Sequence, residues 1–101
     1  MKVSNMTSSK GNSIANQFII NDATIKHTSP NGTESIYNGT MFQSYNSNIA
    51  FRHYTGAVVL DECYWDYSVT TGKYRNIFLG EGIAETRKKI KSGEYKLINL
   101  N

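Results

Sequence analysis

The sequence predicts an α+β domain in which a small antiparallel β-sheet of five to six short strands carries one or two C-terminal helices packed on it. Three observations lead to this fold class. Short apolar runs with β-type alternation fill the chain up to residue 60. Asn, Ser and Thr make up 30 of the 101 residues, and these residues favour turns, caps and strand surfaces over long helices. Beyond Trp65, the apolar residues take helical spacing.

The chain is expected to divide into a flexible N-terminal arm, residues 1–13, and a single α+β domain, residues 14–101. The arm is polar and rich in small residues, which is typical of a loosely held chain end. The domain then offers a series of short runs with strand-like alternation. The expected strands are residues 18–20, 24–28, 33–37, 41–45, 49–54 and 57–60.

Glycine and asparagine mark the turns between these strands. The Ser-Pro-Asn-Gly sequence of residues 29–32 is a strong turn signal. The Asn38-Gly39 pair is the sharpest hairpin signal, because both residue types accept the left-handed backbone of a two-residue turn. Thr55-Gly56 marks a further turn before the last of these strands. Short strands joined by tight turns predict an antiparallel meander.

Two C-terminal segments have helical spacing. The first would begin at a cap residue, Ser68 or Thr70, and end at Gly80. A strand in this segment is the alternative. The second helix covers residues 83–92 and carries basic side chains on its outer face. Residues 95–100 return to an extended apolar pattern and are expected to add a last strand.

The composition indicates an intracellular protein. Cys63 is the single cysteine, so no intramolecular disulfide and no thiolate metal cluster can form, and a reducing compartment is expected. The first dozen residues lack the apolar segment of a signal peptide, and no run approaches 18 apolar residues. We therefore expect no contact with a membrane.

No combination of residues predicts catalysis strongly. A Cys-His-Asp nucleophile would have to combine Cys63 with His53 and with Asp61 or Asp66. Nearby carboxylates raise the pKa of a thiol, which works against that combination. The histidines, His27 and His53, fall in predicted strands and are expected to be structural or exposed. We expect a protein that is not an enzyme and that holds no cofactor or metal.

Charged residues define two candidate binding surfaces. The first is a short acidic segment with a neighbouring tyrosine, which would contact a protein partner: Asp61, Glu62, Asp66 and Tyr67. The second is the basic C-terminal third, which would attract a polyanion such as nucleic acid. Its residues are Lys73, Arg75, Arg87, Lys88, Lys89 and Lys91. The formal net charge of the chain is +3.

Two stretches carry a resemblance. Residues 42–50 read Phe-Gln-Ser-Tyr-Asn-Ser-Asn-Ile-Ala, and residues 65–79 contain Ser-Val-Thr-Thr-Gly-Lys-Tyr. This pattern resembles a group of short uncharacterised proteins encoded by bacteriophages and mobile elements of low-GC Gram-positive bacteria. The resemblance covers residues 40–101. Many members carry His where this chain has Tyr74, so a role for that imidazole does not transfer.

The resemblance implies a small accessory protein that acts on host machinery. We therefore expect a non-enzymatic phage or mobile-element protein that binds and inhibits a host defence complex, such as a CRISPR effector. Its partner would be a protein or a ribonucleoprotein. The alternative is a small nucleic-acid-binding accessory protein that uses the basic C-terminal segment.

Overall fold

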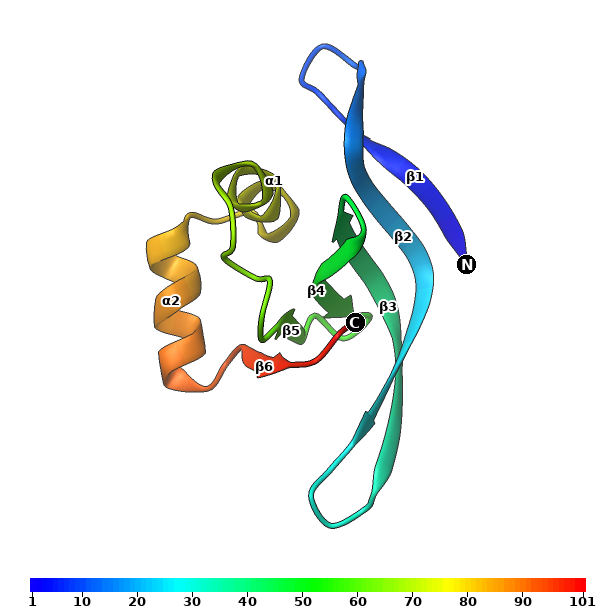
Figure 1. Ribbon diagram of the computed structural model, residues 1–101, viewed down its shortest axis with the longest axis vertical. Coiled ribbons are helices and arrows are strands. Elements are labelled where there is room, and N and C mark those ends of the chain that lie inside the picture. Colours follow the sequence, from blue (N-terminus) through cyan, green and yellow to red (C-terminus); the bar gives the residue numbers. More distant parts are fainter.

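Six strands form one sheet in chain order, and two helices connect the fifth strand to the sixth (Figure 1). The computed structural model describes residues 1–101. Its elements are β1 (Lys2–Thr7), β2 (Ser13–Thr28), β3 (Glu34–Ser44), β4 (Ser47–His53), β5 (Val58–Asp61), α1 (Val69–Leu79), α2 (Ile83–Ser92) and β6 (Lys96–Ile98). The first five strands pair antiparallel, and β6 pairs parallel with β5. The predicted α+β class is confirmed.

The N-terminal segment is a strand, so the predicted flexible arm over residues 1–13 is wrong. β1 pairs antiparallel with β2 from Lys2 opposite Asn21 to Thr7 opposite Ser13. Only Met6 of this strand is buried, and it joins the main core. The other side chains are exposed because β1 is the edge strand of the sheet, and such a strand can be polar. Backbone hydrogen bonds to β2 hold this strand in place, and the low hydrophobicity of its sequence does not predict them.

β2 and β3 are long strands that each fuse two predicted ones, and the Asn38-Gly39 turn between two of them does not exist. Gly39 lies inside β3 and pairs with Ala23 and His53. A Cβ atom on Gly39 would lie 2.0 Å from the carbonyl oxygen of Arg52, so glycine is needed for the close approach of β3 to β4. The turn predicted at residues 29–32 is confirmed. It closes the long β2–β3 hairpin that extends beyond the rest of the molecule (Figure 1).

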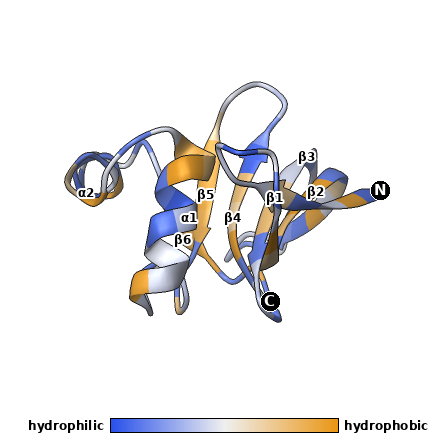
Figure 2. Ribbon diagram, turned by 90° about the horizontal axis from the view of Figure 1, so that it is seen from above, coloured by the Kyte–Doolittle hydropathy of each residue, from blue (hydrophilic) through white to orange (hydrophobic).

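The sheet has two different faces. Both helices lie on one side of it (Figure 2), where Phe78 of α1 stacks on Phe42 of β3 with ring centroids 5.7 Å apart. Ile49, Leu60 and other buried residues complete this main core. The opposite face, which we call the helix-free face, carries a smaller buried cluster of Ala23, Met41 and Phe51. Strand residues therefore bury apolar surface on both sides.

The helix boundaries follow the predicted cap signals. The side-chain oxygen of Ser68 accepts a hydrogen bond from the Thr71 N–H at 3.1 Å, and Gly80 ends α1 in the left-handed conformation at φ 72°. The alternative of a strand in this segment is wrong. Gly93 ends α2 in the same way. Neither helix is long and apolar enough to span a bilayer.

Candidate functional site

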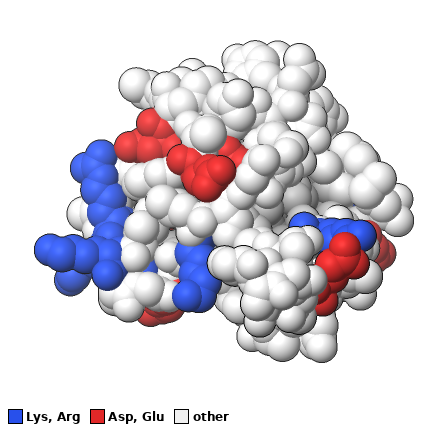
Figure 3. Space-filling view, turned by 60° about the horizontal axis from the view of Figure 1, so that its bottom comes forward, with Lys and Arg blue, Asp and Glu red and all other residues white.

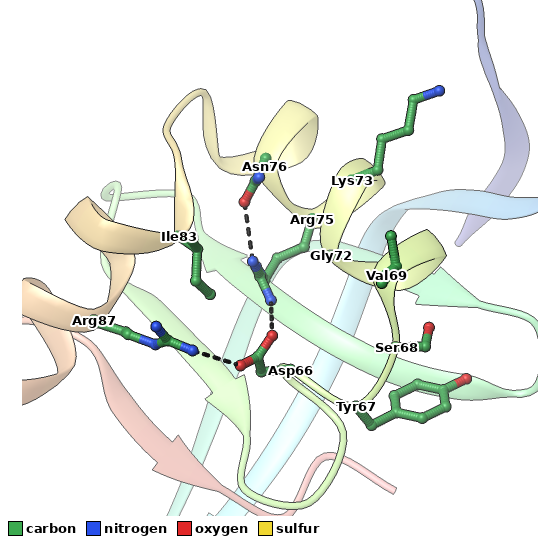
Figure 4. A pocket seen from close by; sticks show the side chains of 10 residues that line it. All are labelled: Asp66, Tyr67, Ser68, Val69, Gly72, Lys73, Arg75, Asn76, Ile83 and Arg87. Carbon is green, nitrogen blue, oxygen red and sulfur yellow. Dashed lines mark hydrogen bonds and ion pairs between the residues drawn. The ribbon is translucent and has the colours of Figure 1, made fainter.

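A groove of about 680 Å³ opens between α1, α2 and the loop before α1 (Figure 4). We call it the interhelical groove. Its wall consists of loop residues before Ser68, one face of α1, and the beginning of α2. The residues that line it are Asp66, Tyr67, Ser68, Val69, Gly72, Lys73, Arg75, Asn76, Ile83 and Arg87.

Arg75 forms the inner wall of the groove. The residue is 1% exposed, which is unusual for an arginine. Its Nη1 donates to the Trp65 carbonyl at 2.6 Å, and its Nη2 donates to Asn76 Oδ1 at 3.0 Å. The guanidinium also lies 5.3 Å from the centre of the Trp65 ring, and its Nε has no hydrogen-bond partner. A permanently charged group is thus fixed in place beside the groove with one donor unused.

Asp66 is shared by two arginines from different helices (Figure 4). Its Oδ1 lies 3.4 Å from Nη1 of Arg75 on α1, and its Oδ2 lies 3.2 Å from Nη2 of Arg87 on α2. The Arg87 side chain is 63% exposed. With Lys73 on the rim, three cationic side chains line the groove against one carboxylate. The charge that remains after pairing is positive.

Both helices begin at this groove, because Val69 and Ile83 line it and are the first residues of α1 and α2. The first backbone N–H groups of a helix lack intrahelical acceptors and carry a partial positive charge. At α1, Ser68 accepts from one of them. Gly82 offers α2 no side-chain cap, which leaves its N-terminal N–H groups without such an acceptor. The helix ends therefore add to the positive field of the side chains.

The predicted acidic surface is not formed. Asp61 is 1% exposed, and its carboxylate accepts hydrogen bonds from the N–H groups of Cys63, Tyr64 and Leu100. It is a structural residue that cannot contact a partner, so this part of the prediction is wrong. Of the other three predicted residues, Glu62 is exposed, and Asp66 and Tyr67 line the interhelical groove.

The predicted basic residues divide into three places. Lys73, Arg75 and Arg87 meet in the groove, although Arg75 is too buried to act as an exposed phosphate contact. Lys88 and Lys91 are exposed on α2, where basic side chains gather along one edge of the molecule (Figure 3). The sixth residue, Lys89, turns away to pair with Glu81 at 2.7 Å.

Glu81 is the centre of a separate polar cluster that fastens α2. It accepts hydrogen bonds from Lys89 Nζ at 2.7 Å, Thr86 Oγ1 at 2.6 Å and Tyr95 Oη at 2.9 Å. Burial raises the pKa of Glu81, but these hydrogen bonds outweigh it and leave the pKa below its usual value. Burial and the contact with Glu81 raise the pKa of Tyr95. Since every member has a partner inside the cluster, we assign it to stability.

Two of the residues that a Cys-His-Asp nucleophile would need, His53 and Asp61, have other hydrogen-bond partners. His53 Nδ1 lies 2.7 Å from the Thr55 hydroxyl, and Asp61 binds backbone N–H groups. Cys63 is exposed. Among His, Cys, Asp and Glu, no group of three or more side chains is arranged to hold a metal ion.

Several lining residues of the groove were not predicted. These include Val69, Gly72 and Asn76, which share one face of α1 with the predicted Lys73 at the spacing i, i+3, i+4 and i+7. This spacing can be recognised in the sequence because a helix is predicted there. The contribution of Ile83 was not visible, because it depends on how α2 packs.

The sequence profile of a family of unknown function, DUF8033, matches residues 1–95. No curated protein and no solved structure matches the chain. The matched segment contains β1 through α2 and therefore the complete interhelical groove. None of these comparisons assigns an activity.

Proposed function

The chain belongs to the DUF8033 family, and we propose that it is a non-enzymatic protein that binds single-stranded nucleic acid through the interhelical groove. The observation that carries this proposal is the charge of the groove. Three cationic side chains and the N-termini of two helices meet there, opposed by Asp66 alone. Such a site favours an anion, and a phosphate group can use both backbone N–H and side-chain donors.

The exposed arginine of the groove is suited to exchange its partner for a phosphate. Arg87 pairs with Asp66 at 3.2 Å while 63% of its side chain is exposed. An ion pair of this kind contributes at most about 1 kcal/mol, so little is lost when the guanidinium turns to a phosphate. The buried Arg75 would keep Asp66 in place during that exchange. Lys73 on the opposite rim supplies a second contact.

A nucleic-acid strand could extend from the groove along α2. Lys88 and Lys91 are exposed on that helix, next to Arg87 in the chain. With Lys73 and Arg87, they offer four phosphate contacts without any contribution from Arg75, which is buried, or from Lys89, which pairs with Glu81. This continuity supports a polyanion over a small isolated anion.

Two tyrosines beside the groove support a single strand as the ligand. Tyr64 and Tyr67 are 38% and 48% exposed, and their rings form an edge-to-face pair with centroids 5.4 Å apart. Tyr67 also lines the groove. Unpaired bases stack on exposed aromatic rings, whereas the bases of a duplex are inaccessible to them.

The proposal is tested by the salt dependence of binding to a fluorescent single-stranded oligonucleotide, measured by anisotropy. Four contacts predict a slope of about −3 for log K against log salt, and Lys73→Gln with Arg87→Gln should reduce its magnitude by about 1.4. Lys26→Gln removes an equally exposed charge on the β2–β3 hairpin and should leave the slope unchanged. Absence of binding at low salt, or an equal effect of the control, would refute the proposal.

A second candidate function is the inhibition of a host defence complex, such as a CRISPR effector, in the bacterial cytoplasm. The observation that favours it is the β2–β3 hairpin, which extends from the body (Figure 1) and exposes 66% of Ile36 and 38% of Tyr37. Exposed apolar residues on a projecting hairpin suit insertion into a partner. The acidic residues predicted for this role favour it less, since Asp61 is buried and Asp66 is paired with two arginines.

The two candidates respond to different substitutions. In a cleavage assay with a purified CRISPR effector, Ile36→Ser should abolish inhibition if the hairpin contacts the effector, and Arg87→Gln should have no effect. In the anisotropy assay, Arg87→Gln should weaken oligonucleotide binding and Ile36→Ser should have no effect. Inhibition that survives Ile36→Ser and Tyr37→Ser together would exclude the hairpin as the inhibitory surface.

A further inference from the structure

A second hollow, of about 390 Å³, lies on the helix-free face of the sheet. Its apolar residues come from successive strands: Ile25 of β2, Tyr37 of β3, Phe51 of β4, Val59 of β5 and Ile98 of β6. In a flat sheet, β2 and β6 would be about 19 Å apart, given a strand spacing of about 4.8 Å. Since both line one hollow, the sheet curves around it, and the site is enclosed by the fold itself.

The two histidines of the chain both line this hollow. His27 comes from β2 and His53 from β4, although 26 positions separate them in the sequence. The His53 ring packs edge-to-face on Tyr37 at 5.5 Å and lies 4.3 Å from the ring of Tyr54. These contacts hold the imidazole in a defined position beside the apolar floor.

The proton of His53 can be assigned from its neighbours. The backbone N–H of Thr55 lies 3.4 Å from Nδ1, and its hydroxyl lies 2.7 Å away. A backbone N–H can only donate, so Nδ1 is the acceptor, and the neutral ring carries its proton on Nε2. His53 therefore has a donor that is not used by Thr55. This is a polar group of the type that orients a ligand in an apolar pocket.

Two charged residues complete the lining, Glu94 and Lys96, and neither forms an ion pair within the chain. Lys96 is exposed and pairs with Val59 in the register of β6 on β5, which places it beside a residue of the apolar floor. With the two imidazoles, the rim offers several hydrogen-bond donors and one cationic side chain. Glu94 is the single carboxylate.

We propose that this hollow is a binding site for a small apolar acid, meaning a molecule with an aromatic or aliphatic body and one anionic group. The body would occupy the floor formed by Tyr37, Phe51 and Val59, and the anionic group would face Lys96 and the imidazole of His53. The volume falls within the range of small-molecule pockets, roughly 300–1,000 Å³, and the apolar lining with few polar groups is typical of them. This site lies on the opposite face from the interhelical groove and is independent of it.

The test compares two fluorescent probes that differ in one charge: anilinonaphthalene sulfonate, and the neutral N-phenylnaphthylamine. Both should bind saturably with one site per chain. Lys96→Gln should weaken the sulfonate about fivefold, the scale of a half-exposed charge contact, and leave the neutral probe unchanged. Tyr37→Ala should weaken both. Lys91→Gln, an exposed charge on α2, is the matched control and should affect neither.

Several outcomes would overturn the proposal. These are non-saturable binding, equal effects of Lys96→Gln and Lys91→Gln on the sulfonate, or displacement of the probe by an oligonucleotide. Light scattering decides the remaining alternative: a dimer that dissociates when Tyr37 is changed to Ala would assign the helix-free face to a second copy of the chain. Circular dichroism of each variant confirms that the fold is kept.

Discussion

The carboxylate of Asp61 accepts a hydrogen bond from the backbone N–H of Leu100, 39 residues further along the chain, at 2.8 Å. The same carboxylate accepts from the N–H groups of Cys63 at 3.0 Å and Tyr64 at 2.8 Å. A single buried side chain therefore joins the turn after β5 to the segment after β6. These hydrogen bonds hold β5 and β6 together at the position where the chain leaves the sheet toward α1 and α2.

Replacing Asp61 by Ala should destabilise the protein by about 3–5 kcal/mol, because three backbone donors would lose a charged acceptor in a buried place. Urea denaturation followed by circular dichroism measures the change. Glu62→Ala is the control: its side chain is exposed, and its effect should stay within about 0.5 kcal/mol. Similar midpoints for the two variants would show that the hydrogen bonds at Asp61 contribute little.

Replacing Gln17 by Met should stabilise the protein by about 1–2 kcal/mol. Gln17 is 1% exposed, and neither its side-chain oxygen nor its nitrogen has a hydrogen-bond partner within the chain. A buried amide without partners is unfavourable, and Met has a similar shape without the polar atoms. Thermal melting provides the measurement. Gln43→Met, which removes an amide that donates to the Tyr45 carbonyl, should not stabilise. A lower melting temperature for Gln17→Met would contradict the expectation.

The Glu81 cluster predicts an acid-sensitive contribution to stability. The pKa of Glu81 is below its usual value of 4.5 in the folded protein, so its stabilising effect is present above that pH and is lost as the pH falls through the folded pKa. The difference in melting temperature between the wild type and Glu81→Gln should therefore shrink as the pH falls from about 6 to about 3. Glu85→Gln, an exposed change on α2, should show no such trend. A melting-temperature difference that stays constant across this pH range would show that the ionised Glu81 carboxylate does not stabilise the fold.

Replacing Gly72 by Ala should separate stability from binding. Gly72 lies inside α1, where Ala is favoured by about 1 kcal/mol, and the added Cβ would lie 3.6 Å from Nη2 of Arg75, an ordinary contact. The melting temperature should rise. The methyl group would also enter the interhelical groove between the ligand and Arg75, so oligonucleotide affinity should fall in the anisotropy assay. An unchanged affinity would place the nucleic-acid contact outside the groove.

Local signals in the sequence predicted the helices and the turns at residues 29–32 and 55–56 because their causes are local. Ser68 caps α1 through an N–H three residues away, and Gly80 and Gly93 supply the left-handed backbone that ends each helix. Asn38-Gly39 has an equally strong local turn signal, but it lies inside β3. The glycine is required by the backbone of Arg52 in the next strand, and this requirement is tertiary. A sequence pattern does not distinguish a glycine that forms a turn from a glycine that allows two strands to approach closely.

The site was predictable by residue type but not by burial. The sequence identified Lys73 and Arg87 as members of the basic C-terminal third, and the structure places both in the groove. It did not show that Arg75 and Asp61 are buried, since their burial depends on acceptors and donors in distant parts of the chain, the Trp65 carbonyl and the Leu100 N–H among them. Charged residues are buried only where such partners exist, and partners are a property of the fold.

The parallel pairing of β5 with β6 has a consequence for the order of folding. The contacts from β1 to β5 join neighbouring strands and can form early, whereas Val59 meets Lys96 only after both helices have been placed. Until then, the outer edge of β5, with its Val-Val-Leu sequence, remains unpaired. An unpaired apolar edge is a site of aggregation. Refolding yield should therefore fall with increasing protein concentration. The time that β6 needs to pair with β5 would set the period during which the chain can aggregate.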